Sequence, residues 1–421
     1  MSPLRNEGPS DRGPRRRMFI SATAWTTFGL FAGLINPPIS AEESHASSVG
    51  TRVGYAALDL SDGANRWMVS RLSHTIPLGA RNLQLVYGNF APGPHDFEAD
   101  GPNPIVVAAA VEFPEGNVYP VRFAGRSDIR LLPGQMAISD PLSVILPPGG
   151  RCFTRTRVIA DTPPYKWPLV RSANPLVGDW SATGLDINRV SDAPEARREP
   201  KCFGPYNMIG VPQRPGNAVV ILGDSVVCGE PGPGDQHGDR GYIERALATN
   251  MPWCNFAVPG ESVAAFIRQS TKRRAMIGHN FTKVVSALGI ADVRNGNEEL
   301  IKQNMHSLWK LLGDQGLAVF QTTITTHTNS IDHWTSVGGQ SVANPNFGPG
   351  GVYHRINDWI RSGPPPLRGY FDPVPAVETG IDSGIWLAPE NQPLTLDGPH
   401  LDRLGAMMAE KAISLPRLQS Q

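Results

Sequence analysis

The sequence has no excess of charge of either sign. Among its 421 residues, Lys plus Arg and Asp plus Glu both number 38, and charged residues make up only 18% of the chain. A protein without a basic field has little to attract nucleic acid or an anionic membrane surface. The composition therefore disfavours both as partners, while 40% of apolar residues is ample for packed cores.

Cysteine is scarce, and common metal-binding motifs are missing. The four cysteines form no CxxC pattern, and no HExxH pattern occurs; they are Cys152, Cys202, Cys228 and Cys254. We therefore expect no structural metal site. An even count allows two disulfides in an oxidising compartment, with three possible connectivities. Pairing of Cys152 with Cys202 is the favoured one, because both flank the same segment.

The chain also lacks the apolar run of ~20 residues that a membrane-spanning helix needs. Its N-terminal apolar stretch, SATAWTTFGLFAGLI, follows PRRRMFI and precedes PPISA. The adjacent Arg16 and Arg17 resemble a twin-arginine export signal, and Ala41 offers a small-residue cleavage site. We expect residues 1–41 to be a cleaved signal, leaving a periplasmic or secreted protein without a stable membrane span. An uncleaved membrane anchor is the alternative.

The length predicts two domains, at roughly 100–200 residues each. Between residues 42 and 200, strand-like segments alternate with Gly- and Pro-rich turns; the segments are NLQLVYGNF, PIVVAAAVEF, VYPVRF and LSVILPP. This pattern is typical of an antiparallel β-sandwich or jelly roll. Residues 201–216 are expected to be a linker. Several aromatic side chains of this part could stack on sugar rings but more often belong to cores; they are Trp67, Tyr87, Phe90 and Trp180.

Residues 217–421 show a different pattern, in which strands alternate with helices. AVVILG, WCNFAVPG, KVVSALG and LAVFQTTIT are expected strands. The clearest expected helix has apolar residues at helical spacing and Gly313 as a stop signal; these residues are Ile301, Met305, Leu308 and Leu312. The alternation predicts an α/β domain whose functional loops follow the carboxyl ends of parallel strands. Those loops are residues 223–225, 258–260, 289–292 and 325–327.

The first of these loops presents Ser225 at the end of the apolar segment Val219 to Leu222. A serine becomes a nucleophile only with a base in hydrogen-bond reach, an acid that orients the base, and donors for the oxyanion. Near the C-terminus, the sequence DGPH places Asp397 three residues before His400. One short loop can therefore carry both the acid and the base.

These motifs resemble those of the SGNH, or GDSL, hydrolase superfamily. GDS at 223–225, VPG ending at Gly260, GIAD at 289–292 and DGPH at 397–400 match its four blocks in order, over about residues 217–415. The resemblance implies a flavodoxin-like parallel sheet. It also implies that Ser225 is the nucleophile, His400 the general base and then acid, and Asp397 the residue that orients His400.

The resemblance carries over less completely to the oxyanion hole. The family combines the backbone N–H of the serine with that of the second-block glycine, which correspond to Ser225 and Gly260. Its third donor is an asparagine side chain from a GxND block, and this sequence has Ala291 there. Loss of one such donor costs about 3 to 4 kcal/mol. Asn295 or Asn297 could replace it, two backbone donors could suffice, or the activity could be weak.

Other polar residues of these loops have less direct roles. We expect Asp224 to shape its turn and Asp292 to order its loop by hydrogen bonding. His327 and Trp334 could line a substrate groove, although a solvated loop explains them as well. The cationic run Lys272, Arg273 and Arg274 is expected to form a solvated helix face.

The predicted function is that of a serine esterase, which needs no cofactor or metal. An exported enzyme with a β-sandwich before its catalytic domain resembles SGNH carbohydrate esterases, which remove acetyl groups from polysaccharides. The absence of a long apolar lid-like helix also favours small acyl groups, acetyl above all. The alternatives are an O-acyltransferase that uses the same triad, or a carbohydrate-binding protein with a degenerate site. The sequence is silent on oligomeric state.

Overall fold

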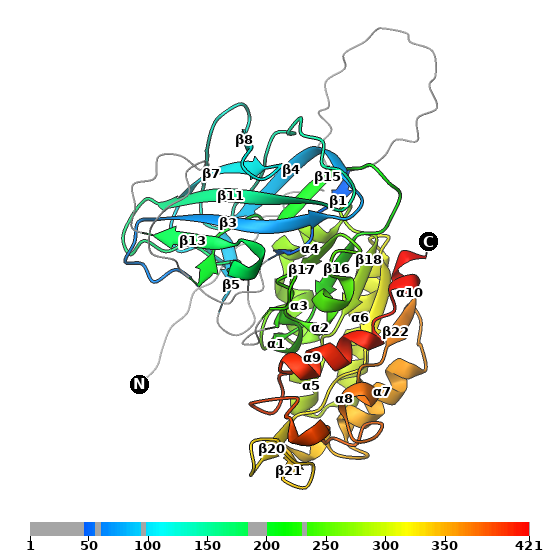
Figure 1. Cartoon of the computed structure of the whole chain (residues 1–421). Helices are drawn as coiled ribbons and strands as arrows, with labels where there is room; N and C mark the ends of the chain where they lie inside the picture. Colours follow the sequence, from blue (N-terminus) through cyan, green and yellow to red (C-terminus); the bar gives the residue numbers. More distant parts are fainter. Residues whose placement is uncertain (1–45, 55–59, 94–97, 184–199, 230–233, 421) are drawn as a thin grey trace, which may run out of the picture. The chain divides into compact units, whose positions relative to one another are not determined.

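The computed structural model describes residues 46–54, 60–93, 98–183, 200–229 and 234–420 (Figure 1). The predicted export signal, residues 1–41, lies outside these ranges. Within them, no helix combines the length and the apolar character that crossing a bilayer requires.

The first half of the chain forms two larger antiparallel sheets. One has the order β1-β15-β4-β10, with bounds Ser47–Ser48, Asn207–Pro212, Ala80–Gly88 and Met136–Ile138. The other has the order β13-β3-β11-β7-β8, with β9 beside β7; the bounds are Trp180–Thr183, Trp67–Ile76, Gly150–Ala160, Ile105–Glu112, Val118–Pro120 and Ile129–Leu131. Two short ribbons add β5 (Phe90–Pro92) with β6 (Glu98–Asp100), and β12 (Arg171–Ser172) with β14 (Lys201–Cys202). That these sheets form a sandwich or jelly roll stays a prediction.

The longest strands of this half are β3 and β11. Neither shows the regular alternation of apolar and polar residues that is typical of a half-exposed strand. They pair along their whole length, and β3 is buried at eight of its ten positions. Its polar side chains are buried with partners: the Arg71 Nε lies 2.9 Å from the Glu112 carboxylate, and both ring nitrogens of His74 are hydrogen-bonded. Burial accordingly lowers the pKa of His74 to about 4.

The second half contains the predicted parallel sheet. Its strands are β17 (Trp253–Asn255), β16 (Val219–Leu222), β18 (Lys283–Ser286), β19 (Ala318–Thr322) and β22 (Gly369–Phe371), hydrogen-bonded in that order. The chain order 2-1-3-4-5 is that of flavodoxin-like sheets. β16, the strand before Ser225, therefore lies between β17 and β18.

Helices cover both faces of the parallel sheet (Figure 1). One apolar core packs Val220 and Leu222 of β16 against α3 (Val263–Gln269), α4 (Thr271–Ile277), α6 (Glu298–Gly313) and α7 (Val352–Arg361). The other packs Val219 and Ile221 against α1 (Ser225–Cys228), α2 (Tyr242–Leu247), α8 (Val374–Val377), α9 (Arg403–Ala409) and α10 (Leu415–Gln419). Because successive side chains of a strand point to opposite faces, a wholly apolar strand fits this arrangement.

The two halves share strands across the boundary expected at residues 201–216. β15 lies within this segment, yet it pairs with β1 and β4 of the first half. Conversely, β2 (Val53–Gly54) pairs in parallel with β17 and extends the second-half sheet by one edge strand. The segment expected to be a linker therefore contains a strand between two others.

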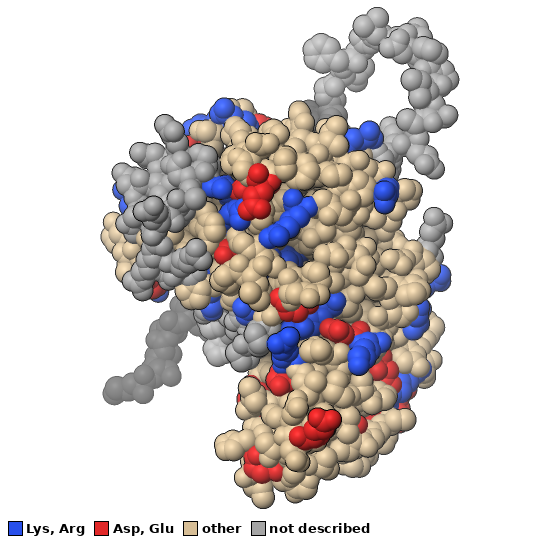
Figure 2. Space-filling model, in the orientation of Figure 1, with Lys and Arg blue, Asp and Glu red and all other residues tan. Residues whose placement is uncertain are grey.

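Two expectations about polar residues were wrong. All four cysteines lie in the described ranges as buried thiols outside any disulfide, so the expected pairing of Cys152 with Cys202 is wrong. The Lys272–Arg273–Arg274 run is no solvated face, because Arg273 is 1% exposed. Its Nε lies 3.0 Å from Glu98 Oε1 and its Nη1 2.8 Å from Glu261 Oε2. On the molecular face in Figure 2, acidic and basic side chains are interspersed, as the balanced composition leads one to expect.

Candidate active site

The turn after β16 presents Ser225 as the first residue of α1. Asp224 caps this helix, because its Oδ1 accepts a hydrogen bond from Val226 N at 3.0 Å. The predicted turn-shaping role of Asp224 is thus observed. Gly223 is needed next to it, since a Cβ there would lie only 2.1 Å from Val227 Cγ2. The serine side chain consequently leaves a buried strand half-exposed at the carboxyl edge of the sheet.

Ser225, His400 and Asp397 lie in one hydrogen-bonded chain. The distance from Ser225 Oγ to His400 Nε2 is 2.6 Å, and His400 Nδ1 lies 2.6 Å from Asp397 Oδ2. The second carboxylate oxygen of Asp397 accepts from His400 N at 3.1 Å. Because a carboxylate only accepts, its place beside Nδ1 favours the tautomer with the proton on Nδ1, which leaves Nε2 as an acceptor for the Ser225 hydroxyl.

The loop that carries Asp397 and His400 is held by hydrogen bonds at Gly398. Gly398 N donates to Thr395 Oγ1 at 3.0 Å, and Trp386 Nε1 donates to Gly398 O at 2.7 Å. Gly398 has a φ of +105°, and a Cβ on it would lie 2.2 Å from Thr328 O. Only glycine fits this close approach, so the loop of the acid and base is positioned against the Thr328 backbone and the Trp386 indole.

The second predicted oxyanion donor, Gly260, lies in the loop after β17. Val258 N of this loop donates to Gly223 O at 2.9 Å, which joins the Gly260 loop to the Ser225 turn. Gly260 is exposed and has a φ of +79°. The buried pair of Glu261 with Arg273 fixes the next residue. Arg273, which the sequence analysis expected in solvent, therefore supports the loop that carries Gly260.

Ala291 occupies the third-block position in α5 (Ile290–Asn295), which follows β18. Its helix is tied to the second-block region, because Asp292 Oδ2 accepts from Val263 N at 3.0 Å. This is the loop-ordering contact expected of Asp292. Asn297 is engaged elsewhere as the cap of α6, where its Oδ1 accepts from Leu300 N at 3.1 Å. Asn295 is the exposed last residue of α5.

His327 and Trp334 both belong to the region beside the Asp397–His400 loop. The His327 ring would lie 3.3 Å from a Cβ on Gly398, and it packs edge-on against Phe347 with ring centroids 5.6 Å apart. Burial first, and then the charge of Arg294, lowers the pKa of His327. Trp334 Nε1 donates to Thr328 Oγ1 at 2.8 Å. Both side chains are partly buried, so neither lies in a fully solvated loop.

Sequence reasoning did not single out Arg294. This exposed residue lies three positions after Ala291 on α5, and residues at this spacing share a helix face. Its charge acts on His327 and on the buried Asp224, whose pKa burial raises to about 7. The only sequence signal is its helical spacing from Ala291.

One group of side chains in the described ranges has metal-ligand types, but an arginine already pairs with both of its carboxylates. His354, Asp358 and Asp382 bring potential ligand atoms within 4.8 Å of one another. Arg361 Nη1 lies 3.3 Å from Asp358 Oδ1 and also contacts the Asp382 carboxylate. The guanidinium thus places a positive charge against both carboxylates of the group.

No family model matches the sequence, and no curated protein matches it at a significant level. Solved structures that are similar include GDSL-type acylhydrolases and acetylxylan esterases, at low identity and over about half of the chain.

Three similar solved structures illustrate the range, and one of them covers most of this chain. A GDSL-like lipase from Bacteroides thetaiotaomicron is 16% identical with a TM-score of 0.34, covering 48% of this chain and 87% of its own. An acetylxylan esterase from Geobacillus stearothermophilus is 14% identical with a TM-score of 0.32, covering 49% and 95%. A salicylyl-acyltransferase from a tetracycline biosynthetic pathway is 10% identical with a TM-score of 0.32, covering 88% and 96%.

Proposed function

We propose that the protein is a serine ester hydrolase. The observation that supports this proposal is the pair of 2.6 Å contacts that join Ser225 to His400 and His400 to Asp397. In the proposed reaction, His400 Nε2 takes the hydroxyl proton of Ser225 while Oγ attacks the ester carbonyl. His400 then returns the proton to the leaving alcohol, and an acyl-serine remains. Water, deprotonated by His400, attacks this acyl group and releases the acid and Ser225.

The oxyanion of each tetrahedral intermediate needs donors at the same edge of the sheet. We assign this role to the backbone N–H groups of Ser225 and Gly260, whose loops are joined by the Val258 to Gly223 hydrogen bond. Since alanine has no side-chain donor, position 291 contributes none. The proposed enzyme therefore works with two backbone donors, and its rate on simple esters is expected to be modest.

The proposed substrate carries a small acyl group, acetyl above all, on a carbohydrate alcohol. Export through residues 1–41 and a sandwich arrangement of the antiparallel sheets belong to the same proposal, since an exported esterase would meet extracellular polysaccharide. Two exposed apolar side chains lie close in sequence to the proposed site residues. Leu396, beside Asp397, is 69% exposed, and Ile331, three residues before Trp334, is 93% exposed. Esters with longer acyl chains are therefore the informative comparison.

The test is hydrolysis of p-nitrophenyl acetate, butyrate and octanoate by the wild type and by Ser225→Ala. We expect acetate to be the best substrate and the variant to lose about a thousandfold or more in kcat, because the nucleophile is removed. Ser307→Ala, an exposed serine on α6, is the matched control and should keep full activity. Equal rates for wild type and Ser225→Ala would contradict the proposal, and preferred turnover of octanoate would contradict its small-acyl part.

Transfer to a sugar hydroxyl is distinguished by the products. If p-nitrophenyl acetate is supplied together with xylose oligosaccharides, a hydrolase releases free acetate in proportion to p-nitrophenol. Acetylated oligosaccharide in excess of free acetate would instead identify an acyltransferase. No turnover, together with retained binding of the oligosaccharide, would identify a binding protein, for which Ala291 is the specific sequence observation.

A further inference from the structure

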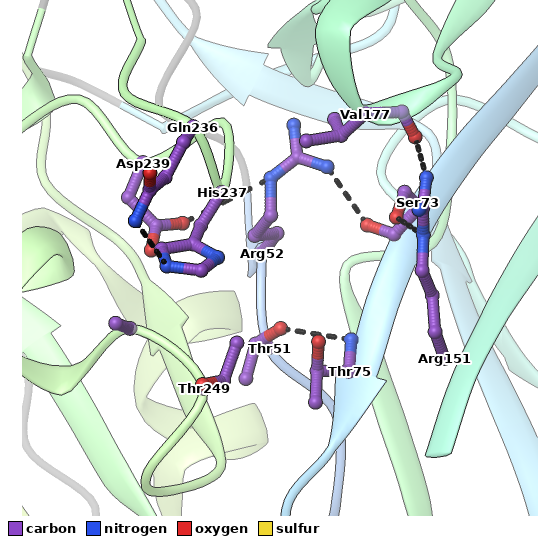
Figure 3. A pocket seen from close by; sticks show the side chains of 11 residues that line it. Thr51, Arg52, Ser73, Thr75, Arg151, Val177, Gln236, His237, Asp239 and Thr249 are labelled. Carbon is purple, nitrogen blue, oxygen red and sulfur yellow. Dashed lines mark hydrogen bonds and ion pairs between the residues drawn. The ribbon is translucent and has the colours of Figure 1, made fainter. Parts of the chain in front are cut away.

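A polar pocket lies apart from the proposed catalytic residues, at the junction of the first-half strands with the loop between α1 and α2 (Figure 3). Its volume is about 90 Å³, whereas a single water needs only about 10–15 Å³. Ser225, Asp397 and His400 do not line it. Most of the residues that line it are polar, notably Thr51, Arg52, Thr75, His237, Asp239 and Thr249, although about half of the lining surface is apolar.

Two buried groups that face this pocket have hydrogen-bonding capacity left over. Asp239 is 1% exposed, and neither of its carboxylate oxygens has a hydrogen-bond partner. Arg52, 5% exposed, has a free Nε, which lies 3.9 Å from Asp239 Oδ1. This separation is too long for a direct hydrogen bond. Figure 3 shows the two side chains facing one another beside His237.

The remaining contacts of Arg52 hold it rigidly and balance its charge. Its Nη1 donates to Ser73 O at 2.9 Å, and its Nη2 lies 2.7 Å from Asp179 Oδ2. Asp179 itself also accepts from Ser73 N at 2.7 Å. The free Nε is consequently presented at a fixed position, and the guanidinium charge is already matched by a carboxylate other than Asp239.

The unused groups define the chemistry of a complementary ligand. Burial raises the pKa of Asp239 well above its usual value, so its carboxyl group offers acceptors and, when protonated, one donor beside the Arg52 Nε donor. Hydroxyl groups satisfy either form, since a hydroxyl both donates and accepts. A metal cation is disfavoured by the guanidinium, which already lies 3.9 Å from the carboxylate. Leaving these atoms unsatisfied costs free energy in a buried site. Threonine hydroxyls on the opposite wall, from Thr51, Thr75 and Thr249, offer further partners.

We propose that this pocket binds a neutral polyhydroxyl ligand, a sugar unit, with neighbouring hydroxyls on Asp239 and one of them accepting from Arg52 Nε. His237 and Thr249 form the exposed rim through which it enters. The site is a binding site without chemistry of its own. It is independent of ester hydrolysis, because none of its lining residues belongs to the proposed triad.

The test is titration of the full chain with methyl β-xyloside, methyl β-galactoside and glycerol. Binding is measured by calorimetry and by ligand-observed NMR. We expect saturable binding of at least one glycoside, equal in wild type and Ser225→Ala. Asp239→Asn, which keeps the shape but removes one acceptor, should weaken binding at least tenfold. Asp314→Asn, an exposed carboxylate on the end of α6, is the matched control and should not change it.

A second variant keeps the proposal testable if Asp239→Asn does not fold. Thr249→Trp fills the pocket from its exposed rim without touching the buried groups, and we expect it to abolish binding. Absence of saturable binding of all three probes to the wild type would overturn the proposal, since ordered water alone would then satisfy Asp239. Full binding by Thr249→Trp would overturn the location. Because Ser225→Ala retains the site, neither result depends on the esterase activity.

Discussion

Asp224 lies in the turn that carries Ser225, and only one of its two carboxylate oxygens accepts a hydrogen bond. Its Oδ1 caps α1, whereas its buried Oδ2 has no hydrogen-bond partner. Burial raises its pKa from 3.8 to about 7. A carboxyl whose pKa is raised on folding binds its proton more tightly in the folded state. The stability that it contributes is therefore complete below about pH 4 and is lost as the pH rises through about 7.

We therefore expect Asp224→Asn to remove part of the pH dependence of stability. Between about pH 4 and pH 8, the free energy of unfolding of the wild type should fall by up to about 4 kcal/mol more than that of the variant. Asparagine can still accept from Val226 N, so the helix cap survives. Urea unfolding at several pH values measures the difference, with Asp314→Asn as an exposed control. Parallel curves for wild type and Asp224→Asn would refute a buried, proton-binding Asp224.

Ala291 leads to a prediction of increased activity. α5 is anchored by Asp292 next to the Gly260 loop, so an asparagine at position 291 would be carried by a helix that is already positioned. We expect Ala291→Asn to raise kcat on p-nitrophenyl acetate about tenfold to a hundredfold, since one oxyanion donor is worth about a hundredfold or more in a mature site. Ala275→Asn, at an exposed alanine of α4, is the control. An unchanged rate would indicate that another group already fills the role.

At the level of single residues, the sequence was informative where chemistry is local and misleading where partners are distant. Spacing was enough to suggest that Asp397 and His400 share one loop, and a turn-shaping role for Asp224 was expected from its residue type. Arg273 looked like a solvated cation because its partner Glu98 lies 175 positions away. Four cysteines suggested disulfides, yet each one is a buried thiol in a packed core.

Among the structural elements, the short loop around Gly398 has the most specific geometric requirement. A Cβ at Gly398 would lie 2.2 Å from Thr328 O, so Gly398→Ala must move the segment between Asp397 and His400. We expect kcat to fall about a hundredfold, because a shift of about 1 Å is enough to misalign a base. KM and the far-ultraviolet circular dichroism should change little.

Gly316 provides a control for backbone strain alone. It has a φ of +85°, and a Cβ there would meet nothing within 4 Å. Gly316→Ala should cost about 1 kcal/mol of stability through its positive φ and leave kcat unchanged. If the two alanine variants lose activity equally, the contact with Thr328 does not position His400.

The predictability of elements differed between the two halves. Buried parallel strands such as β16 are continuous apolar runs, and α6 has a clear helical period, so both were predicted close to their observed bounds. β3 was missed because its buried arginine and histidine obscure the apolar pattern. β15 was taken for linker because it is short, lies among Gly and Pro, and pairs with a strand more than 100 residues earlier.

At the scale of the whole molecule, buried polar contacts join the two halves. β2 adds a first-half strand to the second-half sheet, and Arg171 Nη2 of β12 lies 2.9 Å from Glu244 Oε1 of α2. Glu244 also accepts from Asn255 Nδ2 of β17 at 2.8 Å. No sequence pattern predicts these contacts, because the residues that make them lie on separate elements and each is an ordinary polar residue.

This network predicts that the halves unfold together. Arg171 and Glu244 are 7% and 1% exposed, so Arg171→Met leaves a buried carboxylate without its cation and should lower the free energy of unfolding by about 3 to 5 kcal/mol. The double variant Arg171→Met, Glu244→Gln should recover much of this loss, because no buried charge remains. Lys310→Met, which breaks an exposed pair with Asp314, should cost less than about 1 kcal/mol.

Urea unfolding measures the loss in the free energy of unfolding and shows whether the two halves unfold together. The transition is followed by circular dichroism and by residual hydrolysis of p-nitrophenyl acetate. Because strands are shared in both directions, loss of the first-half sheets must remove β2 from the edge of the parallel sheet and expose β17. We therefore expect a single transition, with both signals lost at the same urea concentration in wild type and in every variant. Two separated transitions, with hydrolysis surviving the first, would show that the second half folds without its partner strand. The Arg171–Glu244 pair would then not couple the unfolding of the two halves.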